Sequence, residues 1–377
     1  YTFTPSMSVN NKATSWIIDD TYVTSISSLP ALVSQNFTWE KVGTINVGLD
    51  VNLFNNRLSG VFEWYQRNTN GMLAPGVQLP AVVGASAPYQ NTADMRTRGW
   101  ELSLNWRDQI GKVGYRIGFN LSDYKSEIIK YDDNAATKLL SSYYPGQTLG
   151  EIWGYIVDGY YTVDDFVDTS SWQLKEGVTS INGYNVRPGD VKFKNLRDDD
   201  TSTNVITSGD NTFDNPGDRK VIGNTTPRYQ YGINLGMNYA GFDLNVILQG
   251  TGKRDYWISN VLTFPMNGDN FVPLFEGLSD YWMPKDPDNG DWSAVNPNAK
   301  YPRIYGNRGN SGSNLRQSDK YLSDASYLRI KNITLSYKLP KKWVNQIFLN
   351  QMKAFVSIEN VATFTSLPSG IDPERIE

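Results

Sequence analysis

Regular alternation of polar and apolar residues restricts the fold of this chain more than any other feature. In residues 44–53 every second side chain is apolar: Ile45, Val47, Leu49, Val51 and Leu53. Successive side chains of a β-strand point to opposite faces, so this segment predicts a strand with one apolar and one polar face. Asn55 and Asn56 then turn the chain into a second alternating segment. The chain is therefore expected to be built from long antiparallel strands.

The same pattern recurs and predicts eight strands in four hairpins. The expected strands are residues 41–54, 57–67, 96–107, 112–124, 229–239, 242–249, 326–339 and 352–364. Within 326–339 the apolar register slips between Ile330 and Ile333, which predicts a β-bulge. Short links join the strands of the first three hairpins and a longer link, residues 340–351, joins those of the fourth, whereas residues 68–95, 125–226 and 258–325 form the long connections.

Short turns on one side and long loops on the other are typical of an outer-membrane β-barrel. We therefore predict an all-β chain that forms part of a transmembrane, antiparallel, up-and-down β-barrel, about eight strands of a larger barrel, with long extracellular loops. The apolar side chains, such as Leu104 and Leu235, should face lipid, and polar neighbours such as Asn105 and Asn234 should face the lumen. A soluble β-sandwich would show the same alternation. Its strands are usually about 5–6 residues long, shorter than those expected here.

Aromatic residues crowd the ends of the expected strands, as the aromatic girdles of membrane barrels do. They are Trp64, Tyr65, Trp100, Trp106, Tyr124, Tyr229, Tyr239, Tyr256 and Trp257. This distribution favours the barrel over the sandwich.

Composition argues against catalysis and nucleic-acid binding. The 377 residues include no Cys and no His, which excludes thiolate zinc sites, cysteine nucleophiles and Ser-His-Asp triads. The net charge is −4 and no basic patch is visible, so no nucleic acid is expected as a partner. The adjacent acids Asp132–Asp133 and Asp164–Asp165 lack the fixed separation that glycoside hydrolysis requires. The chain is not expected to be an enzyme.

Two segments resemble ligand sites only superficially. Residues 195–200 read NLRDDD, and Arg197 stands where a calcium loop needs an oxygen ligand. Residues 250–253 read GTGK but lack the spacing of a phosphate-binding loop. We therefore expect no metal site and no cofactor.

Several motifs resemble the SusC/RagA family of TonB-dependent outer-membrane transporters. They are residues 36–41 (NFTWEK), 46–50 (NVGLD), 55–60 (NNRLSG), 99–102 (GWEL), 150–155 (GEIWGY), 221–229 (VIGNTTPRY), 250–255 (GTGKRD) and 370–374 (GIDPE). The resemblance implies that residues 1–377 are part of one TonB-dependent receptor barrel domain, without the plug and the last strand. It also implies a location in the outer membrane of a Gram-negative bacterium. The intact protein would import glycan fragments or peptides with a SusD-like lipoprotein, and TonB would supply the energy.

The long loops contain many aromatic side chains, which could stack on a substrate or pack on a partner. The candidates for substrate or partner contact are Trp153, Tyr155, Tyr160, Tyr161, Tyr281, Trp282, Trp292 and Tyr305. The alternative is that these residues form small cores that hold the loops together. Two other functions remain open: a surface-exposed β-rich carbohydrate-binding protein without transport activity, and a passive porin or adhesin.

Overall fold

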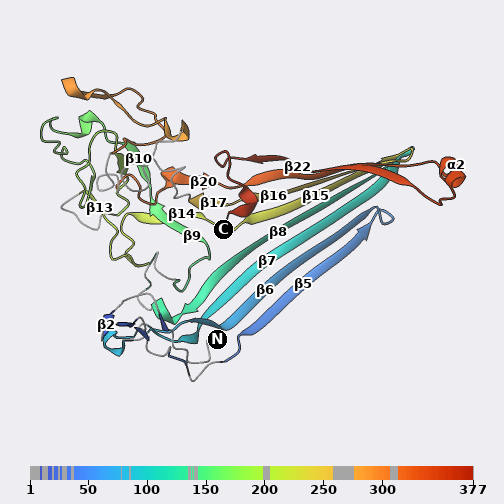
Figure 1. The fold of residues 1–377 in the computed structure, drawn as a ribbon, viewed down its shortest axis with the longest axis horizontal. Helices are drawn as coiled ribbons and strands as arrows, with labels where there is room; N and C mark the ends of the chain where they lie inside the picture. Colours follow the sequence, from blue (N-terminus) through green and yellow to red (C-terminus); the bar gives the residue numbers. More distant parts are fainter. Residues whose placement is uncertain are drawn as a thin grey trace. The chain divides into compact units, whose positions relative to one another are not determined.

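The computed structural model shows an almost entirely β-structured chain (Figure 1). It describes residues 9–10, 16–18, 21–23, 26–27, 32–34, 38–77, 79–84, 86–134, 137, 139, 143–197, 204–257, 276–305 and 313–376. None of the described helices has the length and hydropathy needed to span a bilayer.

The central element is one eight-stranded sheet in the order β22-β21-β16-β15-β8-β7-β6-β5. Its strands are β5 (Lys41–Leu53), β6 (Leu58–Pro75), β7 (Tyr89–Ile110), β8 (Val113–Tyr131), β15 (Arg228–Tyr239), β16 (Phe242–Lys253), β21 (Tyr327–Lys338) and β22 (Lys353–Thr365). Each of these strands lies next to the sheet strand that follows it in the chain. The eight strands and the up-and-down order predicted from the alternation are confirmed.

The register of the strands separates an apolar face from a polar face. Leu235 of β15 pairs with Ile117 of β8 and with Val246 of β16, so these three side chains share one face. Leu235 and Ile117 are 38% and 44% exposed. The adjacent position, Gly236, pairs with Arg116 and Asn245 on the other face. A large exposed apolar face opposite a polar one is what a strand wall between lipid and water requires.

The predicted β-bulge lies in β21. Ile247 of β16 pairs with Asn332, whereas the next residue, Leu248, pairs with Ile330, so Lys331 has no opposite residue. The pairing of β21 with β22 shifts at the same place. The extra residue restores the apolar register that the sequence showed slipping.

The connection predicted at residues 68–95 is mostly strand, and this prediction was wrong. β6 continues to Pro75 and β7 begins at Tyr89, which leaves only 76–88 between them. Alternation fails here because residues 72–75 (MLAP) are apolar on both faces and residues 90–92 (QNT) are polar on both, and side-chain hydrogen bonds add to the pairing of the strands. Arg96 donates to Asn68, and Arg98 donates to Gln66. Hydrophobic periodicity cannot detect a strand whose two faces do not differ in polarity.

Smaller elements give the long connections a fold of their own. Paired strands there are β9 (Glu151–Tyr155) with β14 (Arg219–Asn224), β10 (Val157–Tyr160) with β12 (Val191–Phe193), β11 (Ser180–Ile181) with β13 (Val205–Ile206), β17 (Asp255–Trp257) with β20 (Leu322–Asp324), and β18 (Pro284–Asp286) with β19 (Asp291–Ala294). Near the N-terminus β1 (Val9–Asn10) pairs with β4 (Ile26–Ser27), and β2 (Trp16–Ile18) pairs with β3 (Thr21–Val23). The helices are α2 (Lys341–Val344) and the 3-10 turns η1 (Ala81–Val83), η2 (Asp132–Asn134), η3 (Val163–Asp165), η4 (Glu276–Leu278), η5 (Pro287–Asn289), η6 (Asp319–Tyr321), η7 (Asn345–Ile347) and η8 (Pro373–Arg375).

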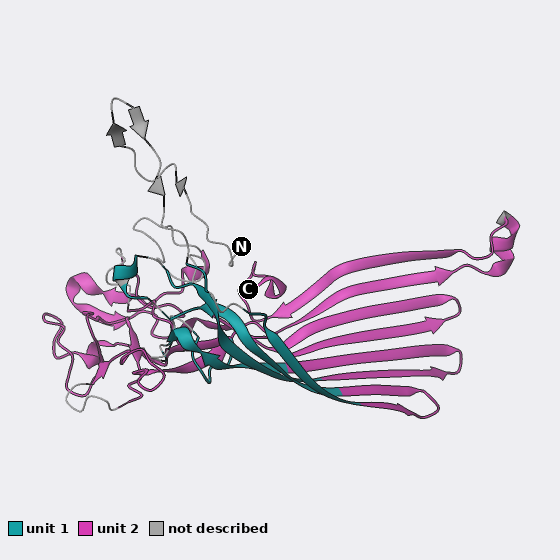
Figure 2. Cartoon of the chain, turned by 90° about the horizontal axis from the view of Figure 1, so that it is seen from below, with its two compact units in different colours: residues 1–48, 63–100, 124–149 teal, residues 49–62, 101–123, 150–377 magenta. Residues whose placement is uncertain are grey.

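The chain divides into two compact units (Figure 2). Unit 1 comprises residues 1–48, 63–100 and 124–149, and unit 2 comprises residues 49–62, 101–123 and 150–377. Within unit 2 the tight turns of the sheet lie at one end, and the small strands of the long connections lie at the other (Figure 2). We call these the turn end and the loop end of unit 2.

Candidate functional site

The described parts of two loop segments of unit 2, within residues 150–226 and 276–321, are joined into one folded body. The Val157 N–H donates to Asp319 Oδ1 over 2.9 Å, and the Tyr160 hydroxyl donates to the Ala299 carbonyl over 3.0 Å. A core of eight buried side chains supports the first segment: Tyr155, Tyr161, Phe166, Ile181, Val186, Val191, Phe193 and Ile206. We call the joined segments the loop body.

A buried carboxylate, Asp190, connects the two segments. It is 1% exposed and accepts hydrogen bonds from the Tyr305 hydroxyl at 2.6 Å, Asn314 Nδ2 at 2.9 Å and the Arg187 N–H at 2.7 Å. Asn314 Oδ1 in turn accepts from the Val191 N–H. Burial raises the pKa of Asp190, although its hydrogen-bond donors oppose that rise. Burial and the neighbouring Asp190 carboxylate also raise the pKa of Tyr305.

The backbone beside Asp190 needs a glycine. Gly189 has φ = 89°, and a Cβ built on it would lie 2.3 Å from Cε3 of Trp282. Its carbonyl accepts the Arg303 N–H over 2.8 Å. Any larger residue would therefore combine left-handed strain with a clash against the indole.

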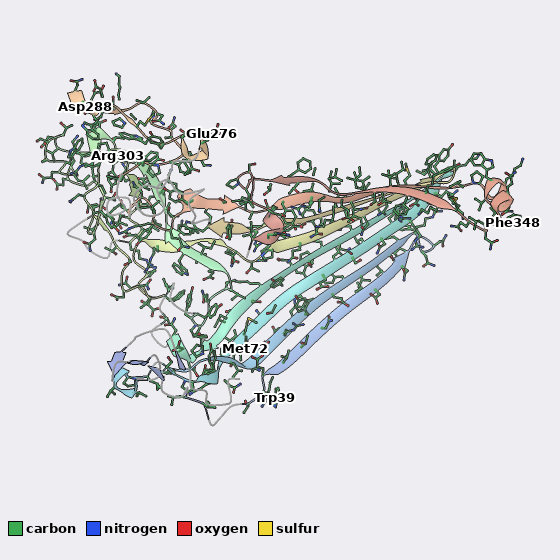
Figure 3. The ribbon with its side chains drawn as sticks, in the orientation of Figure 1. Trp39, Met72, Glu276, Asp288, Arg303 and Phe348 are labelled. Atoms are coloured by element: carbon green, nitrogen blue, oxygen red, sulfur yellow. The ribbon has the colours of Figure 1, made fainter. Side chains whose placement is uncertain are left out.

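A cluster of aromatic and arginine side chains lies next to this buried connection. The rings of Trp172 and Trp292 meet edge to face, with centroids 5.0 Å apart. Arg187 lies 5.7 Å from the Trp172 ring centroid, and Arg303 lies 5.1 Å from that of Trp292 and 4.9 Å from that of Tyr305. All five side chains are partly exposed. We call these five residues the Trp–Arg cluster; Figure 3 labels Arg303 within the loop body.

The cluster combines two kinds of recognition chemistry. Indole and phenol faces stack on flat or apolar ligand groups, and they also hold the guanidinium groups by cation–π attraction. Arginine forks bind carboxylates with two parallel hydrogen bonds. Nη1 of Arg303 is buried and has no hydrogen-bond partner among the described residues. The arrangement is therefore suited to binding a polar or anionic ligand.

The eight aromatic residues predicted from sequence fall into two groups. Trp153, Tyr155, Tyr161 and Trp282 are buried, between 0% and 8% exposed, as the core-packing alternative expects. Tyr160, Tyr281, Trp292 and Tyr305 are partly exposed. Only Trp292 and Tyr305 belong to the Trp–Arg cluster, and direct contact with a substrate stays a prediction for the set.

The acidic segments have structural roles where the structure describes them. Asp165 accepts from the Thr162 N–H over 2.7 Å at the start of η3 and pairs with Lys192 at 3.3 Å. Asp132 pairs with Lys130 at 2.9 Å. Residues 198–200 of the NLRDDD segment lie outside the described residues. The GTGK segment is the end of strand β16.

Lys320 offers a pH-dependent test of the loop body. Its ammonium group lies 4.4 Å from the Tyr160 ring centroid, and burial lowers its pKa from 10.5 to about 8. Between these values the unfolded chain binds more protons at Lys320 than the folded chain does, so this residue adds stability as the pH rises through the window. In Lys320→Met the stability of the loop body should no longer rise with pH in this window. Hydrogen exchange of residues 155–161 at pH 7 and at about pH 9.5 measures the difference.

Comparison with known proteins shows which proteins this chain resembles in sequence. No family model matches it. TonB-dependent receptor P3 of Formosa agariphila is 28% identical over 92% of this chain and 32% of its own length. TonB-dependent receptor SusC of Bacteroides thetaiotaomicron is 24% identical over 99% of this chain and 33% of its own length. The chain is therefore similar in sequence to proteins named TonB-dependent receptors, SusC among them. It spans about a third of the length of these curated relatives.

Solved structures of the RagAB peptide importer show the same fold. The RagAB peptide importer in its "closed-closed" state matches with a TM-score of 0.70 and 22% identity. The match covers 99% of this chain and 36% of that one. Its "open-open" state matches with a TM-score of 0.68. The expected fold, part of a transmembrane barrel, is thereby confirmed.

Proposed function

We propose that this chain is part of a transporter that imports nutrients across the outer membrane of a Gram-negative bacterium with energy from TonB. The observation that carries the proposal is the eight-stranded sheet with an exposed apolar face, in a chain homologous to TonB-dependent receptors. Its curated relatives are named as receptors, and the solved structure it resembles is named as a peptide importer. We therefore propose no enzymatic role.

Residues 1–377 would belong to a single barrel domain. β5 and β22 are the two ends of the sheet, and an open sheet edge is unfavourable in hydrocarbon. Additional strands between β22 and β5 would close the wall, and a plug domain would fill the lumen. The two sheet ends and the chain's share of its relatives' length support this arrangement.

The loop body would form the external rim, where a SusD-like lipoprotein docks and the substrate is held. The Trp–Arg cluster is our candidate for substrate contact, with Trp292 and Tyr305 as its aromatic surfaces and Arg187 and Arg303 as its cationic groups. Oligopeptides with acidic groups fit this chemistry well, because carboxylates pair with arginine and peptide planes stack on indole. Glycan fragments that carry carboxylates are the second substrate class that fits.

Removal of most of the first loop segment should abolish partner binding and uptake together. Strand β9 pairs with β14 through Tyr155 and Arg219, so residues 157–217 can be replaced by a short glycine link beyond this pair. In the intact transporter we expect normal barrel assembly, loss of co-purification with the SusD-like lipoprotein, and loss of uptake. If both co-purification and uptake persisted, docking and substrate binding would have to be assigned to other segments.

A double substitution separates the two roles of the rim. Trp292→Ala with Arg303→Ala removes the centre of the Trp–Arg cluster while leaving Asp190 and its donors in place. Uptake of acidic peptides should fall at least tenfold, and lipoprotein co-purification should persist. Val295→Ala, at a 58% exposed position near β19, is the matched control and should transport normally. Unchanged uptake in the double variant would show that substrate contact lies elsewhere.

A further inference from the structure

The link between β21 and β22 differs from the other tight links of the sheet. β15 and β16 are joined by Ala240 and Gly241 alone, whereas residues 339–352 here form α2 and η7. Backbone hydrogen bonds order this link: the Leu339 N–H donates to the Met352 carbonyl, and the Leu349 N–H donates to the Val344 carbonyl. Val344 is 1% exposed and fills its interior.

Large apolar side chains of this link point into solvent. Trp343 is 60% exposed, Phe348 98%, Leu349 48% and Met352 44%. Phe348 also has φ = 60°, a left-handed conformation that is unfavourable for a bulky residue. Figure 3 labels Phe348 at the turn end of unit 2, beyond the ends of the strands. An almost fully exposed aromatic residue on a strained backbone gains nothing from the protein itself, which points to an external apolar environment.

The link is also strongly basic. Residues 338–353 contain Lys338, Lys341, Lys342 and Lys353 and no acidic residue, in a chain whose net charge is −4. All four lysines are exposed. Apolar side chains combined with lysines in a short amphipathic segment are characteristic of membrane-surface anchors. The complementary surface is one of phosphate headgroups over acyl chains.

The position of the link in the sheet places it at the level of those headgroups. Tyr239, Phe242 and Tyr337 occupy neighbouring, paired positions at the turn end of the apolar face, and the rings of Phe242 and Tyr337 are 4.5 Å apart. An aromatic row of this kind marks the membrane–water interface in barrels. Lys338 follows Tyr337 directly, so the link starts where the hydrocarbon ends.

We propose that residues 338–353 form a membrane anchor that binds anionic phospholipid at the turn end of the sheet. Trp343, Phe348, Leu349 and Met352 enter the interfacial layer, and the lysines contact headgroup phosphates. The anchor fixes the β21–β22 hairpin at one depth in the bilayer. This inference rests on the proposed membrane location, and the experiment below separates the two.

These 377 residues contain no cysteine, so single spin labels can be placed in them once any cysteine elsewhere in the intact transporter has been replaced by serine. The reporter is Asn350→Cys, next to Leu349; Val356→Cys, at a 69% exposed position paired with Leu335, reports the lipid face. Asn55→Cys, in the β5–β6 turn, is the water-exposed control. The labelled intact transporter is placed in nanodiscs of phosphatidylethanolamine and phosphatidylglycerol. Collision rates with oxygen and with a water-soluble nickel chelate then report the depth of each label.

The ratio of the oxygen collision rate to the nickel collision rate should be severalfold higher for the label at 350 than for the label at 55. It should approach the ratio measured at 356. Lys341→Gln with Lys342→Gln, Phe348→Ser, or discs of phosphatidylcholine alone should each move it toward the value at 55. A label at 350 that matches 55 while 356 reports lipid would overturn the anchor and leave the membrane location intact. If 356 also reported water, the membrane location itself would fail, and the anchor with it. If the label at 350 reported lipid contact to the same extent in phosphatidylcholine discs and in the lysine variant, the anionic-lipid part of the proposal would be overturned.

Discussion

Leu104→Arg should destabilise the membrane-inserted protein by about 2–4 kcal/mol if the residue lies near the bilayer midplane. The Leu104 side chain lies over Gly60 beside Val51: a Cβ on Gly60 would be 3.1 Å from Leu104 Cδ2 and 3.2 Å from Val51 Cγ2. This position is therefore on the apolar face, and an arginine there would carry its charge into hydrocarbon. Urea unfolding of the intact transporter in lipid vesicles, followed by the heat-dependent gel shift of folded barrels, measures the loss.

The neighbouring residue gives a matched control. Asn105 lies on the face opposite to Leu104 and lines a hollow of about 640 Å³ together with Arg116, Gly118 and Asn234. Asn105→Arg places the same charge on that polar face and should change stability by less than about 0.5 kcal/mol, as surface substitutions usually do. Equal losses for the two variants would contradict the assignment of the faces.

Asp190→Ala should destabilise the loop body by about 3 kcal/mol, because it removes the acceptor of the Tyr305 hydroxyl and leaves the buried Asn314 Nδ2 without its acceptor. The two loop segments should then separate more readily, and uptake should fall because the Trp–Arg cluster draws side chains from both. Hydrogen exchange at Val191 and limited proteolysis of residues 186–193 follow the loss. The barrel strands should keep their protection.

Two further substitutions test the cause of this loss. Asp190→Asn keeps one acceptor oxygen. It also removes a carboxylate charge that burial disfavours, as the raised pKa of Asp190 shows. The loss of stability should therefore be clearly smaller than for Asp190→Ala. Asp164→Ala removes an exposed carboxylate from the same segment and should behave as wild type. A loss for Asp164→Ala as large as that for Asp190→Ala would show that the buried connection is not what holds the loop body.

The sheet could be predicted from the sequence because its two faces meet different solvents. In residues 229–239 the apolar and polar positions alternate without interruption, and the register pairs them face by face as expected. The slip between Ile330 and Ile333 could be predicted for the same reason, since one extra residue in a bulge returns the apolar side chains to the same face. The extension of β6 to Pro75 and of β7 from Tyr89 could not be predicted, because residues 72–75 (MLAP) are apolar on both faces, residues 90–92 (QNT) are polar on both, and neither run alternates.

The Trp–Arg cluster could be predicted only in part. Aromatic residues in long loops are visible in the sequence, but burial decides which of them reach the surface. Tyr161 and Trp292 look alike in sequence, yet Tyr161 is fully buried and Trp292 meets Trp172 at the surface. Arg187 and Arg303 were missed altogether, since nothing in their sequence neighbourhood reveals a stacking partner far along the chain.

The most direct test of the account is the accessibility of single cysteines along β15 in the intact transporter. Positions 233, 235 and 237 lie on the apolar face and positions 234 and 238 on the polar face; Gly236 is left unchanged because a Cβ there would lie 2.3 Å from Arg116 Nε. In outer-membrane vesicles, a water-soluble maleimide should label positions 234 and 238 and spare 233, 235 and 237. Labelling without this alternation, or equal labelling of both faces, would contradict a membrane wall around a wet lumen.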